Sequence, residues 1–405
     1  MALQHLRIDQ INEAQLQRLI DGRASETRDI EYKRDPYGNA DRDHAELLAD
    51  ISSFANTAGG DLVVGMAATK GVPTGFAPLA VDPDAEILRL ENIARSGLQP
   101  RILNLAMRAV PLASGGSVLV IRVPRSYNPP HRIIRQGTGQ GRFYARSSAG
   151  KYEPNVDELR LLFTRAPQLA ERMRGFRIER VAKVAANDAP VLLLDDRALI
   201  LHVVPFSGFD TRLPLPLGRH IEWYNRFPPV GSPYPQRFRI NVDGLLTLSN
   251  PEANGRVQRA YVQVFHTGIV EAVASSFAWG DGSAQNPFRL TALSTEASIV
   301  RYSYGYLRAL LELGAEPPFA MLASLIGMKG IDYSFAMGNV MFEDEAGTLD
   351  RDQFHFTEVI VENVPADPYD YAALLRPLLD EIANAAGRPT TPGFDGTGRY
   401  RIKVD

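Results

Sequence analysis

The chain contains no cysteine. This absence excludes a disulfide scaffold, thiol catalysis, iron–sulfur clusters and cysteine-ligated zinc. Long apolar runs are also missing, since stretches such as 191–194 are far shorter than the roughly 20 residues that a membrane helix needs. Polar residues are spread through the first fifteen residues, which therefore lack the apolar centre of an export signal. We therefore expect a cytoplasmic protein with no membrane partner.

Three motifs of nucleotide and zinc chemistry are missing as well. The sequence has no GxxxxGK[ST] loop, no GxGxxG between a strand and a helix, and no HExxH. The rest of the composition is that of a folded globular protein, with 45% hydrophobic and 22% charged residues. The net charge is −3, so bulk charge cannot attract a nucleic acid and any such affinity must be local. The 405 residues allow two or three domains at roughly 150 residues each.

The first part of the chain reads as an α/β domain, which we place at 1–165. The pattern predicts a short helix at 11–21, a strand in IEYK, a helix over 43–58 that ends at the pair Gly59-Gly60, and a buried strand directly after that pair. A further helix, a hairpin with its turn at 114–116, a short strand and a closing helix from Val156 complete the set.

The second part, 190–405, has the pattern of a separate α+β domain. Asp243-Gly244 and Gly268 are typical of hairpin turns, and seven prolines between 205 and 235 predict a long irregular excursion. Helices are expected at 295–314 and 367–387, with a strand at 354–365 between them. The segment 166–189 is basic and connects the two parts, either as a helix or as a solvated linker. The second domain would serve regulation or self-association as a homo-oligomer.

The most unusual local composition lies between Arg122 and Lys151. These thirty residues hold seven Lys or Arg and no Asp or Glu. Cations neutralise phosphates, and interleaved aromatic rings can stack on unpaired bases. A solvated basic loop beside one core strand would have the same composition. We favour nucleic acid, RNA or DNA, and the predicted binding residues are Arg122, Arg125, Arg132, Arg135, Arg142, Tyr144, Arg146 and Lys151.

A second group of charged residues lies in SETRDIEYKR. Glu26 and Glu31 are five residues apart, so they converge only if the chain bends between them. Two converging carboxylates need a divalent ion or basic partners, and a nuclease site for Mg²⁺ or Mn²⁺ is built in this way. A helix cap at Ser25 and Glu26 with an exposed strand charge at Glu31 explains the same residues equally well.

Three segments together resemble the Schlafen AlbA-type domain family. They are SETRDIEYKR, AELLADISSFANTAGGDLVVGM and GRFYARSSAGKYEPNVDELRLLF, in the family's order and spacing over about 1–165. The resemblance implies a compact α/β domain that binds nucleic acid. No phosphate-binding loop supports ATP as a cofactor, and we expect no cofactor for the binding function.

The resemblance also implies an enzymatic alternative, because related animal domains act as metal-dependent endoribonucleases on transfer RNA. Glu26 and Glu31 match the family's glutamates, with Lys33 or Arg34 placed to stabilise charge on the phosphate. The family's third acid is missing after Gly65, so a third metal ligand would be Asp61 or another nearby acid. A further alternative is an interaction protein whose basic segment binds an acidic protein surface.

Overall fold

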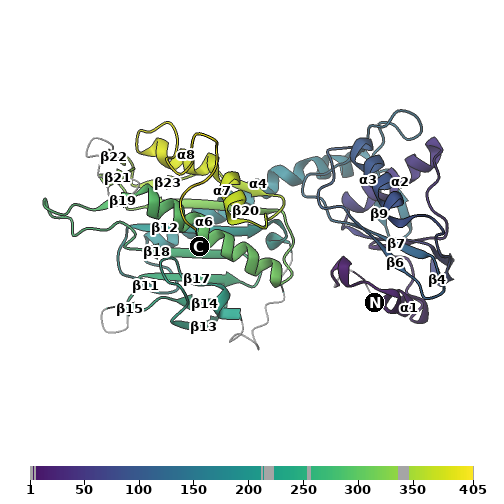
Figure 1. Ribbon diagram of the computed structural model, residues 1–405, viewed down its shortest axis with the longest axis horizontal. Helices are drawn as coiled ribbons and strands as arrows, with labels where there is room; N and C mark the ends of the chain where they lie inside the picture. The colour runs from purple at the N-terminus through teal and green to yellow at the C-terminus, as the bar shows by residue number, and fades with distance from the viewer. Residues whose placement is uncertain are drawn as a thin grey trace. The chain divides into compact units, whose positions relative to one another are not determined.

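The computed structural model describes residues 3, 6–210, 213, 223–252, 257–335 and 346–404. The chain divides into two compact units, Met1–Ala170 and Glu171–Asp405, and each is described here by itself. Both combine helices with sheets, which confirms the predicted fold class (Figure 1). Part of the proline-rich excursion between 205 and 235 lies outside the described residues.

The N-terminal unit is built on a four-stranded sheet with the order β1-β2-β7-β6. Strand β1 (Ile30–Lys33) runs parallel to β2 (Gly60–Val64), while β7 (Ser117–Val123) and β6 (Ala106–Pro111) are added antiparallel. The predicted strand after Gly59-Gly60 and the predicted hairpin turn at 114–116 are confirmed.

Helices cover both faces of this sheet. One face packs on α2 (Asp41–Ala55) and α3 (Pro83–Gly97), and the other on α1 (Glu13–Asp21), which follows the short helix η2 (Ile8–Gln10). Three small two-stranded antiparallel sheets accompany the four-stranded sheet: β3 (Met66–Thr69) with β4 (Val72–Phe76), β5 (Leu98–Gln99) with β8 (Arg132–Ile133), and β9 (Ala145–Ser147) with β10 (Gly150–Tyr152).

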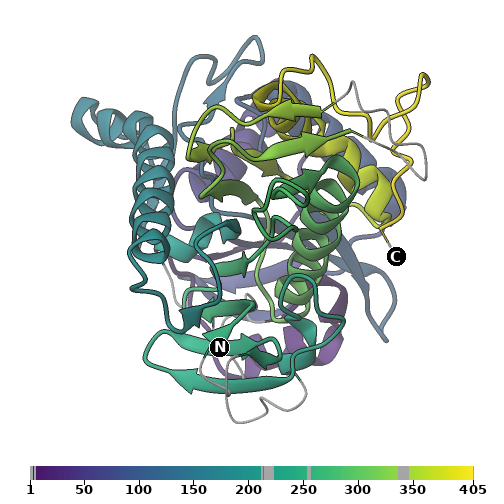
Figure 2. The same cartoon turned by 90° about the vertical axis from the view of Figure 1, so that its left-hand side faces the viewer.

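The basic connecting segment 166–189 is helical as far as Ala185. It belongs to α4 (Val156–Ala185), the long teal helix of Figure 2, which continues through Pro167. The predicted boundary at residue 165 and the division after Ala170 both fall inside this helix. Near its C-terminal end, Val181 and Val184 are buried in the core of the second unit. The segment is therefore a structured part of the fold.

The C-terminal unit contains an eight-stranded antiparallel sheet. Its order is β13-β14-β17-β18-β12-β20-β23, and β24 also pairs with β20. The strands are β12 (Ala198–Pro205), β13 (Arg237–Asn241), β14 (Gly244–Leu248), β17 (Ala260–Phe265), β18 (Val270–Ser275), β20 (Phe319–Ile326), β23 (Gln353–His355) and β24 (Val359–Val361). Smaller sheets are formed by β11 (Leu192–Leu193), β15 (Pro251–Glu252) and β16 (Val257–Gln258), and by β19 (Arg289–Thr291), β21 (Asp332–Ser334) and β22 (Ala346–Thr348).

The helix α6 (Ala292–Glu312) packs on one face of the large sheet with α7 (Pro368–Leu374) and α8 (Arg376–Ala385), and the end of α4 packs on the other. Two short helices, η3 (Phe206–Phe209) and η5 (Tyr224–Arg226), complete the unit. The hairpins at Asp243-Gly244 and Gly268 are confirmed. No helix in the described parts of the chain is long and apolar enough to cross a membrane.

Two predicted elements of the second unit are wrong in detail. The expected helix at 367–387 is divided into α7 and α8 at Leu375, because Pro377 lies in the first turn of α8 and has no N–H to continue a helix. The expected strand at 354–365 is two short strands, β23 and β24, and each pairs with a different half of β20.

Candidate nucleic-acid interface and the ion-pair network beside it

Asn56, at the end of α2, fixes the basic segment to the helix. Its side-chain Nδ2 donates to the carbonyls of His131 at 3.2 Å and Tyr144 at 2.8 Å, and its Oδ1 accepts from the His131 N–H at 2.7 Å. Asn56 is buried, so these three bonds are shielded from water. Through Asn56, the FANTAGG motif at 54–60 therefore holds both ends of the loop 131–144.

The other residues of this motif hold the same region. The Arg146 guanidinium lies 4.1 Å from the centre of the Phe54 ring, and the Arg146 N–H donates to Thr57 Oγ1 at 2.9 Å. Gly59 has a φ of +76°, and a Cβ there would lie 2.6 Å from the backbone nitrogen of Arg125. Only glycine combines this conformation with so close a backbone approach.

Asn56→Ala tests this clamp. We expect the free energy of unfolding of the N-terminal unit to fall by about 2 to 3 kcal/mol, at about 1 kcal/mol for each hydrogen bond removed. Urea unfolding of the full chain measures the change, with Asn128→Ala as the control because Asn128 is exposed in the same segment. Equal stability of the two variants would contradict the clamp.

Asp50 is the centre of an ion-pair network on the α2 face of the sheet. Its fully buried carboxylate accepts from Lys151 Nζ at 2.7 Å and from the Tyr37 hydroxyl at 2.6 Å, and Lys33 Nζ lies 3.4 Å away. Lys33 also pairs with Glu46 at 2.7 Å. Burial and the nearby Asp50 carboxylate raise the pKa of the Tyr37 hydroxyl well above its usual value. The hydroxyl therefore stays protonated and donates to Asp50.

Glu31 joins this network through two cations. Its Oε1 lies 3.0 Å from Lys33 Nζ, and its Oε2 accepts from the buried Arg146 guanidinium. Burial works to raise the pKa of Glu31, but Arg146 and Lys33 outweigh it, so this pKa is lowered. Glu31 is thus an ionised carboxylate whose charge is neutralised by residues of its own unit.

Glu26 and Asp61 do not converge with Glu31 on one site. Glu26 Oε1 accepts from the Tyr32 N–H at 3.1 Å, and its Oε2 lies beside Gly71 in the β3–β4 turn. Asp61 aligns with Ile30 across the parallel strands, and Glu31 aligns with Leu62, so the two carboxylates project from opposite faces of the sheet. Within the described residues, no three His, Asp or Glu side chains are placed to hold a metal ion. The predicted ligand set of Glu26, Glu31 and Asp61 therefore does not fit a shared ion.

Arg122 is held in place by an ion pair with Asp61. Its Nε lies 2.8 Å from Asp61 Oδ1 and its second terminal nitrogen 3.0 Å from Oδ2, which is a bidentate pair. The guanidinium also donates to the carbonyls of Leu3 and Leu6. Arg122, Arg146 and Lys151 are thus three of the predicted binding residues whose charged groups are already bonded inside the unit.

The other predicted binding residues differ in their exposure. Arg132 and Arg142 are exposed, while Arg125, Arg135 and Tyr144 are half-buried. Arg142 pairs with Glu153 at 2.7 Å, and both of these side chains are more than half exposed. The loop that carries Arg135 is fixed at its tip, where the Thr138 N–H donates to Asp41 Oδ2 at 2.7 Å. The predicted segment therefore contains an inner set and an outer set of cations.

Sequence reasoning missed Asp50, Glu46 and Tyr37. Glu46 and Asp50 are four residues apart in α2 and so lie on one side of the helix, which is a visible signal. Asp50 also interrupts an otherwise apolar helix face, where a buried carboxylate requires cationic partners. No sequence pattern identifies those partners, because Lys151 lies 101 residues away.

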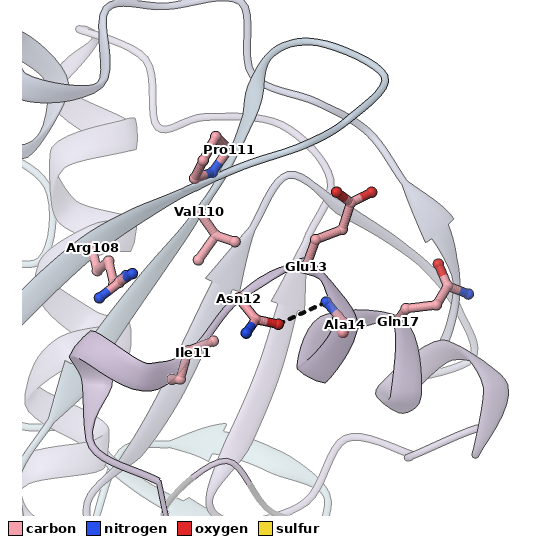
Figure 3. A pocket seen from close by; sticks show the side chains of 8 residues that line it. All are labelled: Ile11, Asn12, Glu13, Ala14, Gln17, Arg108, Val110 and Pro111. Carbon is pink, nitrogen blue, oxygen red and sulfur yellow. Dashed lines mark hydrogen bonds between the residues drawn. The ribbon is translucent and has the colours of Figure 1, made fainter.

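A separate pocket of about 580 Å³ lies where α1 begins beside β6 (Figure 3). Its polar groups are already bonded: Asn12 Oδ1 accepts from the Ala14 N–H at 3.0 Å, and Glu13 Oε2 accepts from the Ala113 N–H at 2.8 Å. None of the predicted site residues lines it. Its lining residues are Ile11, Asn12, Glu13, Ala14, Gln17, Arg108, Val110 and Pro111.

The N-terminal unit is thus an α/β domain with a mixed sheet between helices and a clamped basic loop. The family model described as Schlafen, AlbA_2 matches residues 26–155. This match confirms the resemblance drawn from the sequence, and it is confined to the N-terminal part. No curated protein matches the chain.

Two solved structures are similar to parts of the chain. One is the solution NMR structure of the N-terminal domain of a Nitrosomonas europaea protein described as related to the ATP-dependent DNA helicase RecG. It is 24% identical, with a TM-score of 0.25, and the match covers 34% of this chain and 90% of that one. The other is the crystal structure of the DIP2311 protein from Corynebacterium diphtheriae, 18% identical with a TM-score of 0.26. That match covers 38% of this chain and only 28% of the other.

Proposed function

We propose that the N-terminal unit binds nucleic acid through the outer cations of its basic segment, Arg125, Arg132, Arg135 and Arg142. The observation that carries this proposal is their placement on a stretch that contains no acidic residue, within which the loop that carries Arg132, Arg135 and Arg142 is held by Asn56 and Asp41. A clamped loop loses little conformational entropy on binding, so its charges act as a preformed surface for phosphates. The Schlafen AlbA_2 match supports the same function.

The inner cations of the segment have a structural role instead, because each of them pairs with a carboxylate of the same unit. Arg122, Arg146 and Lys151 neutralise Asp61, Glu31 and Asp50, which the fold buries wholly or in large part. The pair between Arg142 and Glu153 is different, because exposed ion pairs are worth only about 0 to 1 kcal/mol. Arg142 can therefore exchange Glu153 for a phosphate at little cost.

The test is a salt titration of binding to short labelled single-stranded and duplex RNA and DNA, followed by fluorescence anisotropy. We expect the double variant Arg132→Gln/Arg135→Gln to reduce the slope of log Kd against log salt by about 0.7 to 0.9 for each phosphate that is no longer neutralised. Arg7→Gln/Arg18→Gln is the matched control, because both arginines are exposed and Arg18 lies on α1, on the opposite face of the sheet.

Each outcome of this titration has a definite meaning. A reduced slope in the loop variant alone supports the proposal, and the substrate with the lowest Kd identifies RNA or DNA as the ligand. Equal slopes in both variants would contradict it. Absence of binding to every nucleic acid, together with capture of a defined acidic polypeptide at low salt, would favour the interaction-protein alternative instead.

We do not propose the metal-dependent ribonuclease, because Glu31 is already paired with Arg146 and Lys33. In this geometry we expect Glu31→Gln to leave Arg146 buried beside a neutral amide. The variant should therefore lower the melting temperature of the N-terminal unit while nucleic-acid binding persists. Metal-dependent cleavage of RNA by the wild type that Glu31→Gln abolishes, with no loss of stability, would restore the enzymatic alternative.

A further inference from the structure

The C-terminal unit buries a carboxyl group that has no cationic partner among the described residues. Glu296, on α6, is 1% exposed, and its Oε1 accepts a hydrogen bond from the Thr391 hydroxyl. Its Oε2 has no hydrogen-bond partner in the described structure. The buried hydroxyls of Tyr333 and Tyr400 also have no hydrogen-bond partner there. Burial and the neighbouring Glu296 carboxylate both raise the pKa of each of these hydroxyls.

The segment that contacts Glu296 is the stretch 389–404 of the same chain, which is held against α6 through Thr391. The Thr391 N–H donates to Asp380 Oδ1 at 2.8 Å, and the Gly393 N–H donates to Thr391 Oγ1 at 3.0 Å. A Cβ at Gly393 would lie 2.2 Å from Glu296 Oε2, so only a glycine allows the backbone to press on the carboxyl. Beyond it, Tyr400, Ile402 and Val404 are buried in the core.

We propose that Glu296 acts as a pH-dependent clasp that holds the segment 389–404 against α6 when the carboxyl is neutral and loosens it when the carboxyl ionises. A neutral carboxyl can be buried with one hydrogen bond, which here comes from the Thr391 hydroxyl. An ionised carboxylate here would face no cation among the residues that the structure describes. It would therefore regain solvation only if the segment lifted away.

Burial and the nearby Asp380 carboxylate both favour the neutral form of Glu296. Burial raises the pKa of Glu296 to about 7; the Thr391 hydroxyl lowers it, and the Asp380 carboxylate on α8 raises it further. Asp380 is itself only loosely balanced by Arg376 at 3.7 Å. Since the folded-state pKa is raised above the usual value of 4.5, the stabilisation is complete below that value and is lost as pH rises through about 7.

Hydrogen–deuterium exchange of the full chain at about pH 6 and about pH 8, corrected for intrinsic rates, tests the clasp. In the wild type, amides of 389–404 should exchange about tenfold faster at the higher pH, because opening of the segment is coupled to one ionisation. Glu296→Gln, which cannot ionise, should remove this dependence. Glu312→Gln is the control, since Glu312 lies on the same helix but is exposed beside Arg226, and it should behave as the wild type.

A second measurement uses only the wild-type protein. The carboxyl carbon of Glu296 in the wild type should titrate by NMR with a midpoint near 7. A midpoint near the usual 4.5 would overturn the proposal, as would exchange of 389–404 that is the same at both pH values. A pH dependence that survives in Glu296→Gln would also overturn it.

Discussion

Asp50→Ala is expected to lower the free energy of unfolding of the N-terminal unit by about 3 to 5 kcal/mol. The variant removes the carboxylate that Lys151, Lys33 and the Tyr37 hydroxyl share. Asp50 is fully buried, so water cannot replace it without opening the core between α2 and the sheet. Breaking one side of a buried ion pair is costly because the remaining charges keep their desolvation penalty.

Urea unfolding of the full chain measures this loss, with Asp9→Ala as the control. Asp9 pairs with Arg7 at 2.9 Å, but both side chains are more than half exposed, so the control should lose less than about 1 kcal/mol. Asp50→Asn should be intermediate, because the amide keeps the shape and one acceptor oxygen. A loss in Asp50→Ala no larger than that in Asp9→Ala would show that the network contributes little.

Glu271→Ala is expected to have a similar effect on the C-terminal unit, again about 3 to 5 kcal/mol. Glu271 is fully buried on β18 and accepts two hydrogen bonds from Arg180 of α4, at 2.7 and 2.8 Å. The Tyr261 hydroxyl at 2.8 Å and His202 Nε2 at 3.1 Å complete the site. Glu252→Ala is the control, since both side chains of its pair with Arg259 are partly exposed.

The same carboxylate predicts a pH dependence. Burial alone would raise the pKa of Glu271, but the bonds from Arg180 and His202 lower it to about 2. The folded-state pKa lies below the usual 4.5, so the stabilisation is present above 4.5 and is lost as pH falls toward 2. At about 1.4 kcal/mol per pKa unit, the difference between 4.5 and about 2 amounts to roughly 3.5 kcal/mol. Urea unfolding at a series of acidic pH values should show this loss in the wild type and not in Glu271→Gln.

Much of the fold was predictable where local chemistry decides it. The pair Gly59-Gly60 ends a helix and begins a buried strand, and Asp243-Gly244 and Gly268 form hairpin turns, as expected. The strands β12 and β20 were not identified, because they are buried on both faces and show no alternation of apolar and polar residues. The break between α7 and α8 was missed, although Pro377 indicates it.

The candidate site was predictable only as a segment. The sequence showed that 122–151 is basic and lacks acids, but it could not divide these cations into inner and outer sets. The division depends on carboxylates far away in the chain: Asp61 is 61 residues from Arg122, and Glu31 is 115 residues from Arg146. Such pairs are created by the sheet and its helices, and no local pattern records them.

The most direct test of the central claim is a footprint of bound nucleic acid on the wild-type chain. Hydrogen–deuterium exchange is measured with and without the tightest-binding oligonucleotide at low salt. We predict that peptides across 125–144 gain protection, because Arg132, Arg135 and Arg142 bind phosphates there, while peptides from α1 and from β3 and β4 stay unchanged. Protection confined to the C-terminal unit or to α1, with 125–144 unaffected, would contradict the account.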